Sequence, residues 1–183
     1  MRVNCHSSTV KRGNSVDVMT AREHIFRMLD TDGDGVISRR EYLARPERAA
    51  AELGRDSNDP LVASARTLHG RVFDSMDANG DGQVTLDEYA AWAGAGTFDD
   101  VCREALGSLF DLADTDGDGA LDRIEFSRLR GILGNNTDNA GMAFDALDTD
   151  GDGRVDRDEY LTAIRTYVSH GTSPMYDALV TSG

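Results

Sequence analysis

Twelve residues, from Asp148 to Glu159, place carboxylates at intervals that suit a bound divalent cation. The segment reads DTDGDGRVDRDE, with aspartates at its first, third, fifth and ninth places and glutamate at its twelfth. A hard cation such as Ca²⁺ takes about six to eight oxygen ligands at roughly 2.3–2.6 Å. Gly153 at the sixth place allows the sharp bend that turns these side chains towards one point, and the carbonyl of the seventh residue can also face the ion. The spacing therefore predicts a calcium-binding loop.

The same pattern occurs three more times, in residues 30–41, 77–88 and 114–125. Every copy has Asp at places 1 and 5, Asp or Asn at place 3, Gly at place 6, an aliphatic residue at place 8 and Glu at place 12. Acidic turns with glycine are common on surfaces, but four copies with one spacing argue strongly against metal-free turns. The predicted calcium ligands, including the main-chain carbonyl of place 7, are Asp30, Asp32, Asp34, Val36, Ser38, Glu41, Asp77, Asn79, Asp81, Gln83, Thr85, Glu88, Asp114, Asp116, Asp118, Ala120, Asp122, Glu125, Asp148, Asp150, Asp152, Arg154, Asp156 and Glu159.

The four loops, numbered here in chain order, differ in the charge that they offer to a cation. The third and fourth loops have five acidic side chains among their predicted ligands, the first has four, and the second has three because Asn79 and Thr85 stand at places 3 and 9. Ligand charge tunes calcium affinity, so we expect the second loop to bind most weakly. Up to four Ca²⁺ are expected, with Mg²⁺ as a competitor. Because the unliganded carboxylates repel one another, binding should couple to folding.

Aromatic residues flank each loop at matching positions. A phenylalanine stands four residues before each first Asp, and an aromatic residue follows each final Glu; these are Phe26, Phe73, Phe110 and Phe144, and Tyr42, Tyr89, Phe126 and Tyr160. Both sets fall on helical positions beside the loop, where core packing is the simplest role. The entering helices and the closing glutamates also separate these repeats from dockerin modules, whose similar loops lack a full entering helix and end in Asp.

The loops and their flanking aromatics resemble the helix–loop–helix hands of the EF-hand superfamily over nearly all of residues 16–183. This resemblance implies an all-α fold, in which four hands form two pairs within a compact globule. The place-8 residues of paired loops are expected to form short antiparallel bridges, Ile37 with Val84 and Leu121 with Val155.

Apolar periodicity predicts an entering helix before each loop, at about residues 16–29, 61–76, 98–113 and 138–147, and an exiting helix after it. Ser15 and Thr97 are expected to cap helices, and Pro46 should kink the first exiting helix or start a new one. The glycines at 94 and 96 divide the chain into hand pair 1 (residues 16–95) and hand pair 2 (residues 96–171). Residues 1–15 are expected to be a disordered extension, and the tail 172–183 to pack on the body.

The composition narrows the class of protein and its partners. The 183 residues carry 33 acidic and 19 basic side chains, for a formal net charge of −14, which disfavours nucleic acid and anionic membranes as partners. No run approaches the roughly 20 apolar residues of a membrane span, and the N-terminus lacks a secretory signal. Two cysteines make no disulfide framework. We therefore expect a cytoplasmic monomer.

The spacing of the loops points to a subfamily. The first residues of loops one and two are 47 residues apart, against 37 and 34 for the later loops. This long first connection, the glycine break and the apolar tail resemble the sarcoplasmic calcium-binding proteins. Eighteen of the 19 basic residues are arginines, which is similar to the bacterial, calerythrin-type relatives. In that family one hand has usually lost its ligands, whereas here all four keep them. The resemblance implies an intracellular calcium buffer or carrier.

The residues distinguish three functional classes: a calcium sensor, a calcium buffer and an enzyme. A sensor exposes a methionine-rich apolar groove when calcium binds. The six methionines here do not cluster in the exiting helices, and no long polar helix joins the halves, so a buffer is favoured and a sensor that regulates a target protein is the alternative. An enzyme is not expected, because the four histidines form no zinc motif and no nucleophile elbow or phosphate loop is present.

Overall fold

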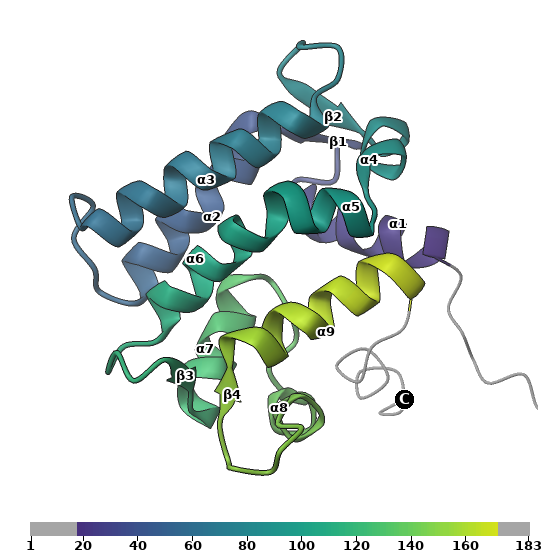
Figure 1. The fold of residues 1–183 in the computed structure, drawn as a ribbon. Coiled ribbons are helices and arrows are strands. Elements are labelled where there is room, and N and C mark those ends of the chain that lie inside the picture. The colour runs from purple at the N-terminus through teal and green to yellow at the C-terminus, as the bar shows by residue number, and fades with distance from the viewer. Residues whose placement is uncertain (1–17, 172–183) are drawn as a thin grey trace, which may run out of the picture.

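Helices dominate the computed structural model, which describes residues 18–171 (Figure 1). The expectations for residues 1–15, including the Ser15 cap, and for the tail 172–183 lie outside the described residues. Among the described helices, none has both the length and the hydrophobicity to cross a bilayer. In chain order the elements are α1 (Val18–Leu29), β1 (Val36–Ser38), α2 (Arg39–Glu52), α3 (Pro60–Met76), β2 (Gln83–Thr85), α4 (Leu86–Trp92), α5 (Ala95–Thr97), the π-helical turn η1 (Phe98–Cys102), α6 (Arg103–Ala113), β3 (Ala120–Leu121), α7 (Arg123–Ile132), α8 (Ala140–Leu147), β4 (Val155–Asp156) and α9 (Arg157–His170).

Two short antiparallel ladders join the loops in pairs, β1 with β2 and β3 with β4. Ile37 lies opposite Val84, and Leu121 lies opposite Val155, which confirms the pairing expected for place 8. All four side chains are completely buried. The alternation of a strand turns place 8 towards the core while places 7 and 9 face away from it. Each bridge therefore ties two loops to the apolar interior beneath them.

The flanking aromatic residues pack in reciprocal pairs across each pair of hands. A ring from the entering helix of one hand meets a ring from the exiting helix of its partner, and all eight residues are buried. These tilted and edge-on contacts have centroid separations in the favourable range for aromatic pairs. The pairs are Phe26 with Tyr89 at 6.0 Å, Tyr42 with Phe73 at 6.0 Å, Phe110 with Tyr160 at 5.7 Å, and Phe126 with Phe144 at 5.6 Å. The expected core role of the aromatics is confirmed.

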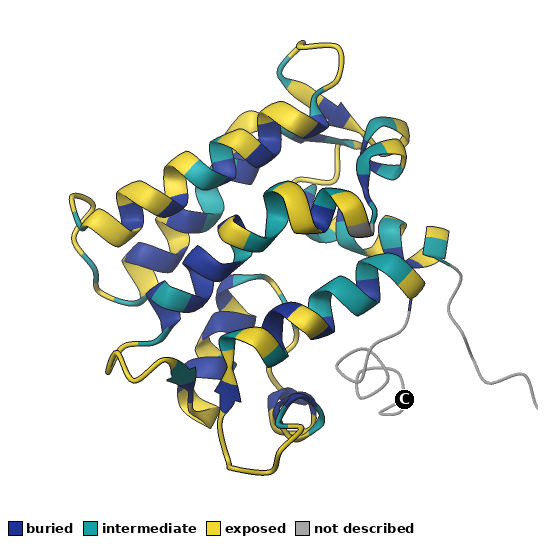
Figure 2. Ribbon diagram, in the orientation of Figure 1, coloured by how far each residue is buried: buried dark blue, intermediate teal, exposed yellow. Residues whose placement is uncertain are grey.

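The two pairs of hands also pack against each other. Ala49 of α2 and Val62 of α3, both from the first half, belong to the apolar core of the second half, and Ala105 of α6 belongs to that of the first. Helix α3 lies beside α6, and α1 lies beside α9 (Figure 1). The buried faces of the helices turn inward towards these contacts (Figure 2). The four hands therefore form one globule.

The structure bears on two local expectations. Of the two outcomes expected at Pro46, a new helix does not start there, because α2 continues through Pro46 to Glu52. A proline inside a helix loses one backbone hydrogen bond, but Pro46 is itself buried where α2 packs against α3, α6 and α7, and this packing keeps the helix intact. Thr97 is not a cap. It has helical dihedrals, and its hydroxyl donates to the Trp92 carbonyl at 2.6 Å, because helical hydrogen bonding already begins with Phe98 N–H donating to Gly94.

Candidate metal centres

Each loop wraps its backbone around the carboxylate of place 1. In the fourth loop, Oδ1 of Asp148 accepts from the backbone N–H of Asp152, and Oδ2 accepts from that of Gly153, both at 3.0 Å. The place-6 amide makes the same bond in the other three loops, at 2.9–3.0 Å. Gly153 has a φ of 85°, in the left-handed region that only glycine adopts at low cost. This explains the place-6 glycine and leaves the first carboxylate fixed in position.

The side chains of places 3 and 5 also accept hydrogen bonds from backbone amides of the loop. In loop four the place-5 amide donates to Asp150 at 3.1 Å, and the amide of Arg154 donates to Asp152 at 2.8 Å. The second loop keeps these bonds with Asn79 at place 3, at 2.8 Å, and with Asp81 at place 5, at 2.9 Å. Alternate side chains therefore accept from the amide two residues on, as in Asx turns. The backbone amides therefore orient the side chains of places 3 and 5 in these loops.

Place 9, a predicted ligand position, caps the exiting helix in every loop. The side chain of place 9 accepts from the backbone N–H of the place-12 glutamate, and the glutamate carboxylate accepts from the backbone N–H of place 9. This reciprocal arrangement is the capping box, formed by Ser38 with Glu41, Thr85 with Glu88, Asp122 with Glu125, and Asp156 with Glu159. The three-residue spacing between place 9 and place 12 predicts this capping box from the sequence. Counting calcium ligands alone did not reveal it.

The threonine of place 2 is a further contributor that the sequence reasoning missed. Its hydroxyl donates to Oε1 of the closing glutamate, at 3.0 Å from Thr31, 2.6 Å from Thr115 and 2.6 Å from Thr149. The second loop has Ala78 at this place and no such bond. The sequence feature that could have revealed this role is the Thr at place 2 of the three DTDGDG loops, which the second loop, DANGDG, replaces by Ala. The hydroxyl helps to hold the glutamate beside the loop.

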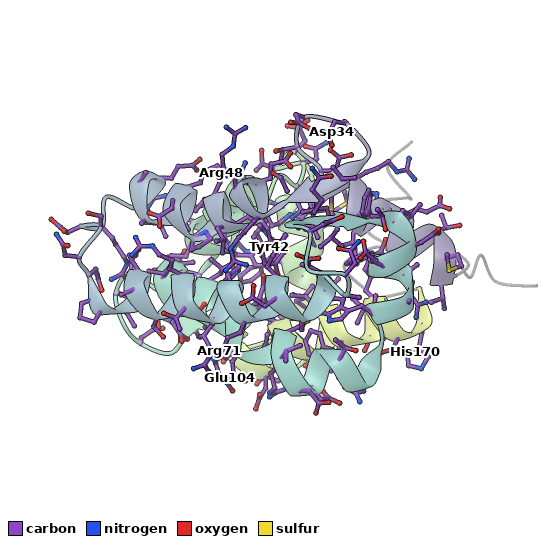
Figure 3. All side chains as sticks on the ribbon, turned by 90° about the horizontal axis from the view of Figure 1, so that it is seen from above. Asp34, Tyr42, Arg48, Arg71, Glu104 and His170 are labelled. Carbon is purple, nitrogen blue, oxygen red and sulfur yellow. The ribbon has the colours of Figure 1, made fainter. Side chains whose placement is uncertain are left out.

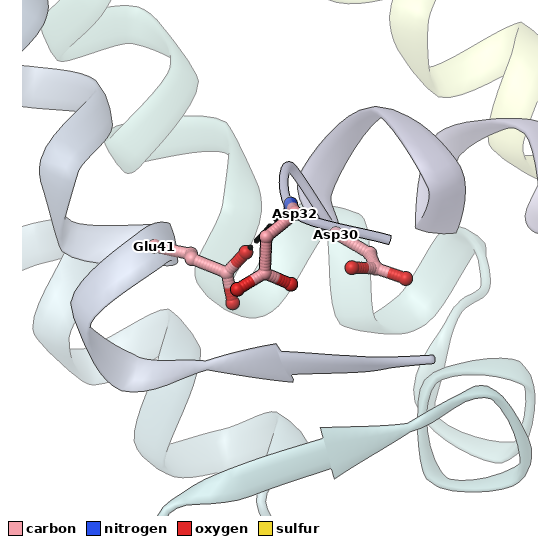
Figure 4. Close-up of side chains that lie close together, drawn as sticks. All are labelled: Asp30, Asp32 and Glu41. Carbon is pink, nitrogen blue, oxygen red and sulfur yellow. Dashed lines mark hydrogen bonds between the residues drawn. The ribbon is translucent and has the colours of Figure 1, made fainter. Parts of the chain in front are cut away.

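Three clusters of acidic side chains converge well enough to hold a cation. Within each cluster the candidate ligand oxygens all lie within 4.8 Å of one another. Figure 4 shows the first of them, where Glu41 from the start of α2 lies beside Asp32. Such oxygen-rich groups suit a hard cation such as Ca²⁺. The clusters are Asp30 with Asp32 and Glu41, Asp114 with Asp116 and Asp118, and Asp148 with Asp150 and Glu159.

The remaining predicted ligands stand beside these clusters or in the second loop. Among residues 18–171, Asp77, Asp81 and Glu88 of the second loop form no cluster of this kind, which is the loop expected to bind most weakly. The place-7 residues stand in or next to the ladders, where Val36 faces Thr85 and Ala120 faces Asp156. The full set of 24 ligands and their order of affinity remain predictions.

Hydrogen bonding and charge set the ionisation of these side chains. Burial alone would raise the pKa of Glu41, but hydrogen bonds from Ser38, Thr31 and Asp32 outweigh it and lower the pKa to about 2. The same balance lowers the pKa of Glu159. In the third loop, burial and the nearby charges of Glu125 and Asp114 raise the pKa of Asp116. That like-charge repulsion is relieved when a cation enters the loop.

One contact joins the third and fourth loops. The guanidinium of Arg154, at place 7 of loop four, forms an ion pair with Asp118, at place 5 of loop three. Asp118 is a predicted ligand and a member of the acidic cluster in the third loop. The guanidinium therefore competes with a cation for one carboxylate of the neighbouring loop.

Comparisons with known proteins agree with this geometry. A family model described as an EF-hand domain pair matches residues 103–165, and a second, described as EF hand, matches residues 22–44 and 70–91. Polcalcin Cyn d 7 of Cynodon dactylon is 35% identical over 83 residues, which cover 44% of this chain and 89% of the polcalcin. The chain belongs to the EF-hand family. It is accordingly a calcium-binding protein.

Other EF-hand proteins match in sequence or in fold. Guanylyl cyclase-activating protein 2 of Lithobates pipiens is 35% identical over 69 residues, 35% of this chain, and the match spans only about a third of that relative's length (34%). A Streptomyces coelicolor calcium-binding protein superposes with a TM-score of 0.73 at 26% identity, over 84% of this chain and 99% of that one. The photoprotein mitrocomin of Mitrocoma cellularia also has a TM-score of 0.73, over 94% of this chain and 99% of its own, and at 21% identity this likeness shows the fold alone. The expected resemblance to bacterial EF-hand proteins agrees with the second of these matches.

Proposed function

We propose that this EF-hand protein is a bacterial, cytoplasmic calcium buffer that binds up to four Ca²⁺ as a monomer, with Mg²⁺ as competitor and without enzymatic activity. The observation that carries the proposal is the packing between the two pairs of hands. A sensor offers the apolar face of a hand pair to a target helix. Here α3 packs on α6 and α1 on α9, so these faces are largely used within the chain itself.

The surface supports a buffer as well. Among the described residues, the large apolar side chains that are exposed are Met19, Leu61, Ile124 and Met142. They belong to four different helices, α1, α3, α7 and α8. A methionine-rich docking groove would instead gather such residues on one face. Scattered single exposures of this kind are ordinary in proteins that bind no partner.

The stoichiometry and source rest on separate observations. Three acidic clusters account for three ions, and the second loop keeps the full spacing with the same backbone bonds to Asp77. The arginine-rich composition and the likeness to the Streptomyces coelicolor protein support a bacterial source.

A calcium sensor is the second candidate. It is favoured by the guanylyl cyclase-activating proteins among the relatives, whose names describe activation of a target. Under this reading, calcium would part the two halves and expose the aromatic pairs. The two candidates differ in the apolar surface that they show when saturated.

The deciding experiment follows the fluorescence of Nile red, a neutral dye that reports apolar surface, during a calcium titration in millimolar Mg²⁺. A buffer gives steady or falling dye signal as calcium fills the loops, since folding hides apolar surface. A signal that rises at saturation overturns the buffer proposal and favours the sensor.

Calorimetry on the same samples tests the stoichiometry, with four Ca²⁺ per chain as the expected result. Glu159→Gln and Glu125→Gln should each remove tight binding, while Glu88→Gln should change total tight binding least. Equal losses of tight calcium in all three variants would contradict the ranking of the loops.

A further inference from the structure

A cavity of about 150 Å³ lies between the two pairs of hands. It is lined by helices of both halves, with Ile25 and Leu29 of α1, Trp92 of α4, Leu129 of α7 and Ile164 of α9 among its wall residues. None of the 24 predicted calcium ligands lines it. Protein interiors hold few voids larger than a water molecule, and an apolar cavity of about 150 Å³ is large enough to bind benzene. The calcium function leaves this space unexplained.

One cation in the cavity wall has no carboxylate partner within the part of the chain that the structure describes. Arg45 of α2 lines the cavity, is half-buried, and has its guanidinium carbon 5.8 Å from the centre of the Tyr42 ring. Tyr42 lies in the interior of the molecule (Figure 3). Burial raises the pKa of Tyr160 and of Cys102, each to about 12, and the positive charge of Arg45 opposes both shifts. The half-buried Arg45 therefore lies close enough to the side chains of the cavity for its charge to act on them.

A second guanidinium lies in the cavity wall. Arg130 is only 2% exposed, and its Nη2 donates to two neutral oxygens, the Asn136 carbonyl at 3.1 Å and Oδ1 of Asn139 at 3.2 Å. Its Nε and Nη1 are buried and have no hydrogen-bond partner among the described residues. The charges of Arg45 and Arg130 both act on Tyr160, whose buried hydroxyl also has no hydrogen-bond partner there.

Neither arginine of the cavity wall is paired with an anion from the described residues. Within residues 18–171, nine arginines pair with a carboxylate and seven do not, and Arg45 and Arg130 are the two of these seven that line the cavity. A buried charge without a counter-ion is costly, and a guanidinium matches a carboxylate in shape and charge. The cavity thus has apolar walls, enough volume for a benzene ring, and two arginines without a carboxylate partner in the described part of the chain.

We propose that this cavity is a second binding site, for a small organic carboxylate whose apolar body is about the size of a benzene ring. The carboxylate pairs with Arg45, and Arg130 adds a second positive charge from the wall. The hydrocarbon body lies among Ile25, Leu29 and Ile164.

The first test titrates phenylacetate into the calcium-saturated full chain by calorimetry, with benzyl alcohol as the uncharged analogue of the same size. One phenylacetate should bind per chain, at least tenfold more tightly than benzyl alcohol, since a charge-assisted pair is lost in the alcohol. Methyl NMR signals of Ile25, Leu129 and Ile164 should shift on binding, while the glycine amides of the loops stay in place. Equal binding of both compounds overturns the proposal, as does the absence of shifts at the cavity.

The second test compares two arginines on the same helix. Arg45→Gln should weaken phenylacetate binding about tenfold and leave benzyl alcohol binding unchanged. Arg48→Gln makes the same change of charge on α2, but Arg48 is exposed and points out from the surface (Figure 3), so it should have no effect. Equal losses in both variants would show general charge attraction and refute the site. The proposal also fails if neither compound binds the full chain.

Discussion

The ion pair between Arg154 and Asp118 makes a quantitative prediction about the third loop. Asp118 is a predicted calcium ligand whose Oδ1 accepts from the Ala120 amide at 3.0 Å, while its Oδ2 faces the guanidinium of the neighbouring loop. A cation entering the third loop must compete with this guanidinium for the carboxylate. Replacing Arg154 by Gln removes the competing charge and keeps a polar side chain, so the third loop should bind calcium more tightly.

The size of the gain follows from the exposure of the pair. The side chains of Arg154 and Asp118 are 45% and 33% exposed, so solvent screens their attraction. Pairs of this kind contribute about 0.2–1 kcal/mol. With tenfold in affinity for each 1.4 kcal/mol, the Arg154→Gln variant should bind calcium at loop three about 1.4-fold to fivefold more tightly. The difference should shrink at high salt, where exposed charges are screened further.

The assay must separate the loops, and the place-6 glycines allow this. The amide of Gly119 donates to Asp114 at 2.9 Å in loop three, and that of Gly153 donates to Asp148 at 3.0 Å in loop four, so each amide NMR signal reports its own loop. Calcium titrations followed at Gly119 should shift to lower concentration in Arg154→Gln.

Arg103→Gln is the matched control for this prediction. Arg103 pairs with Asp158, whose side chain is 80% exposed and is not a predicted ligand, and the substitution removes the same unit of charge. An unchanged or weaker third loop in Arg154→Gln would refute the competition. An equal gain in the calcium affinity of the third loop in Arg103→Gln would show that the change in net charge alone explains the effect.

Three further variants test the caps, the core and the buried histidine. Ser38→Ala removes the cap of α2 and should cost about 1 kcal/mol of unfolding free energy in urea without calcium; no loss would mean that the capping box is unimportant. Phe110→Ala empties a site that is 1% exposed and should cost about 3–5 kcal/mol, whereas Leu61→Ala, at an exposed site, should cost little; similar losses would contradict the packing. His69 is buried, and desolvation and the charge of Arg45 lower its pKa to about 3. As the pH falls, the unfolded chain therefore binds a proton at His69 before the folded chain does. The free energy of unfolding should thus decrease below about pH 6.5, by about 2 kcal/mol at pH 5. His69→Phe should flatten that pH dependence in calcium-saturated protein, the exposed His170→Gln should not, and an unchanged slope in His69→Phe would refute the assignment.

Much of the fold follows from short-range patterns that recur four times. The bridge of Ile37 with Val84 was predictable because place 8 has one orientation in every such loop, and a repeated loop leaves few ways to pair. The helix start at Thr97 was predicted wrongly because a threonine before two aspartates is a good cap only when the preceding residues are not already helical. No new helix starts at Pro46 for a related reason, since tertiary packing outweighs a local preference.

The candidate sites divide in the same way. The carboxylates of places 1, 3 and 5 could be named from the sequence because they bond to amides only two to five residues away. The sequence by itself thus determined the calcium loops, the hands and the aromatic positions, all of which depend on contacts that are local in the chain. Only the tertiary structure decided which ring meets which, that Arg154 reaches Asp118 in another loop, and that Arg45 and Arg130 lie at one cavity between the halves. Those contacts join residues tens of positions apart, and their geometry is set by how whole helices pack, which no local spacing encodes.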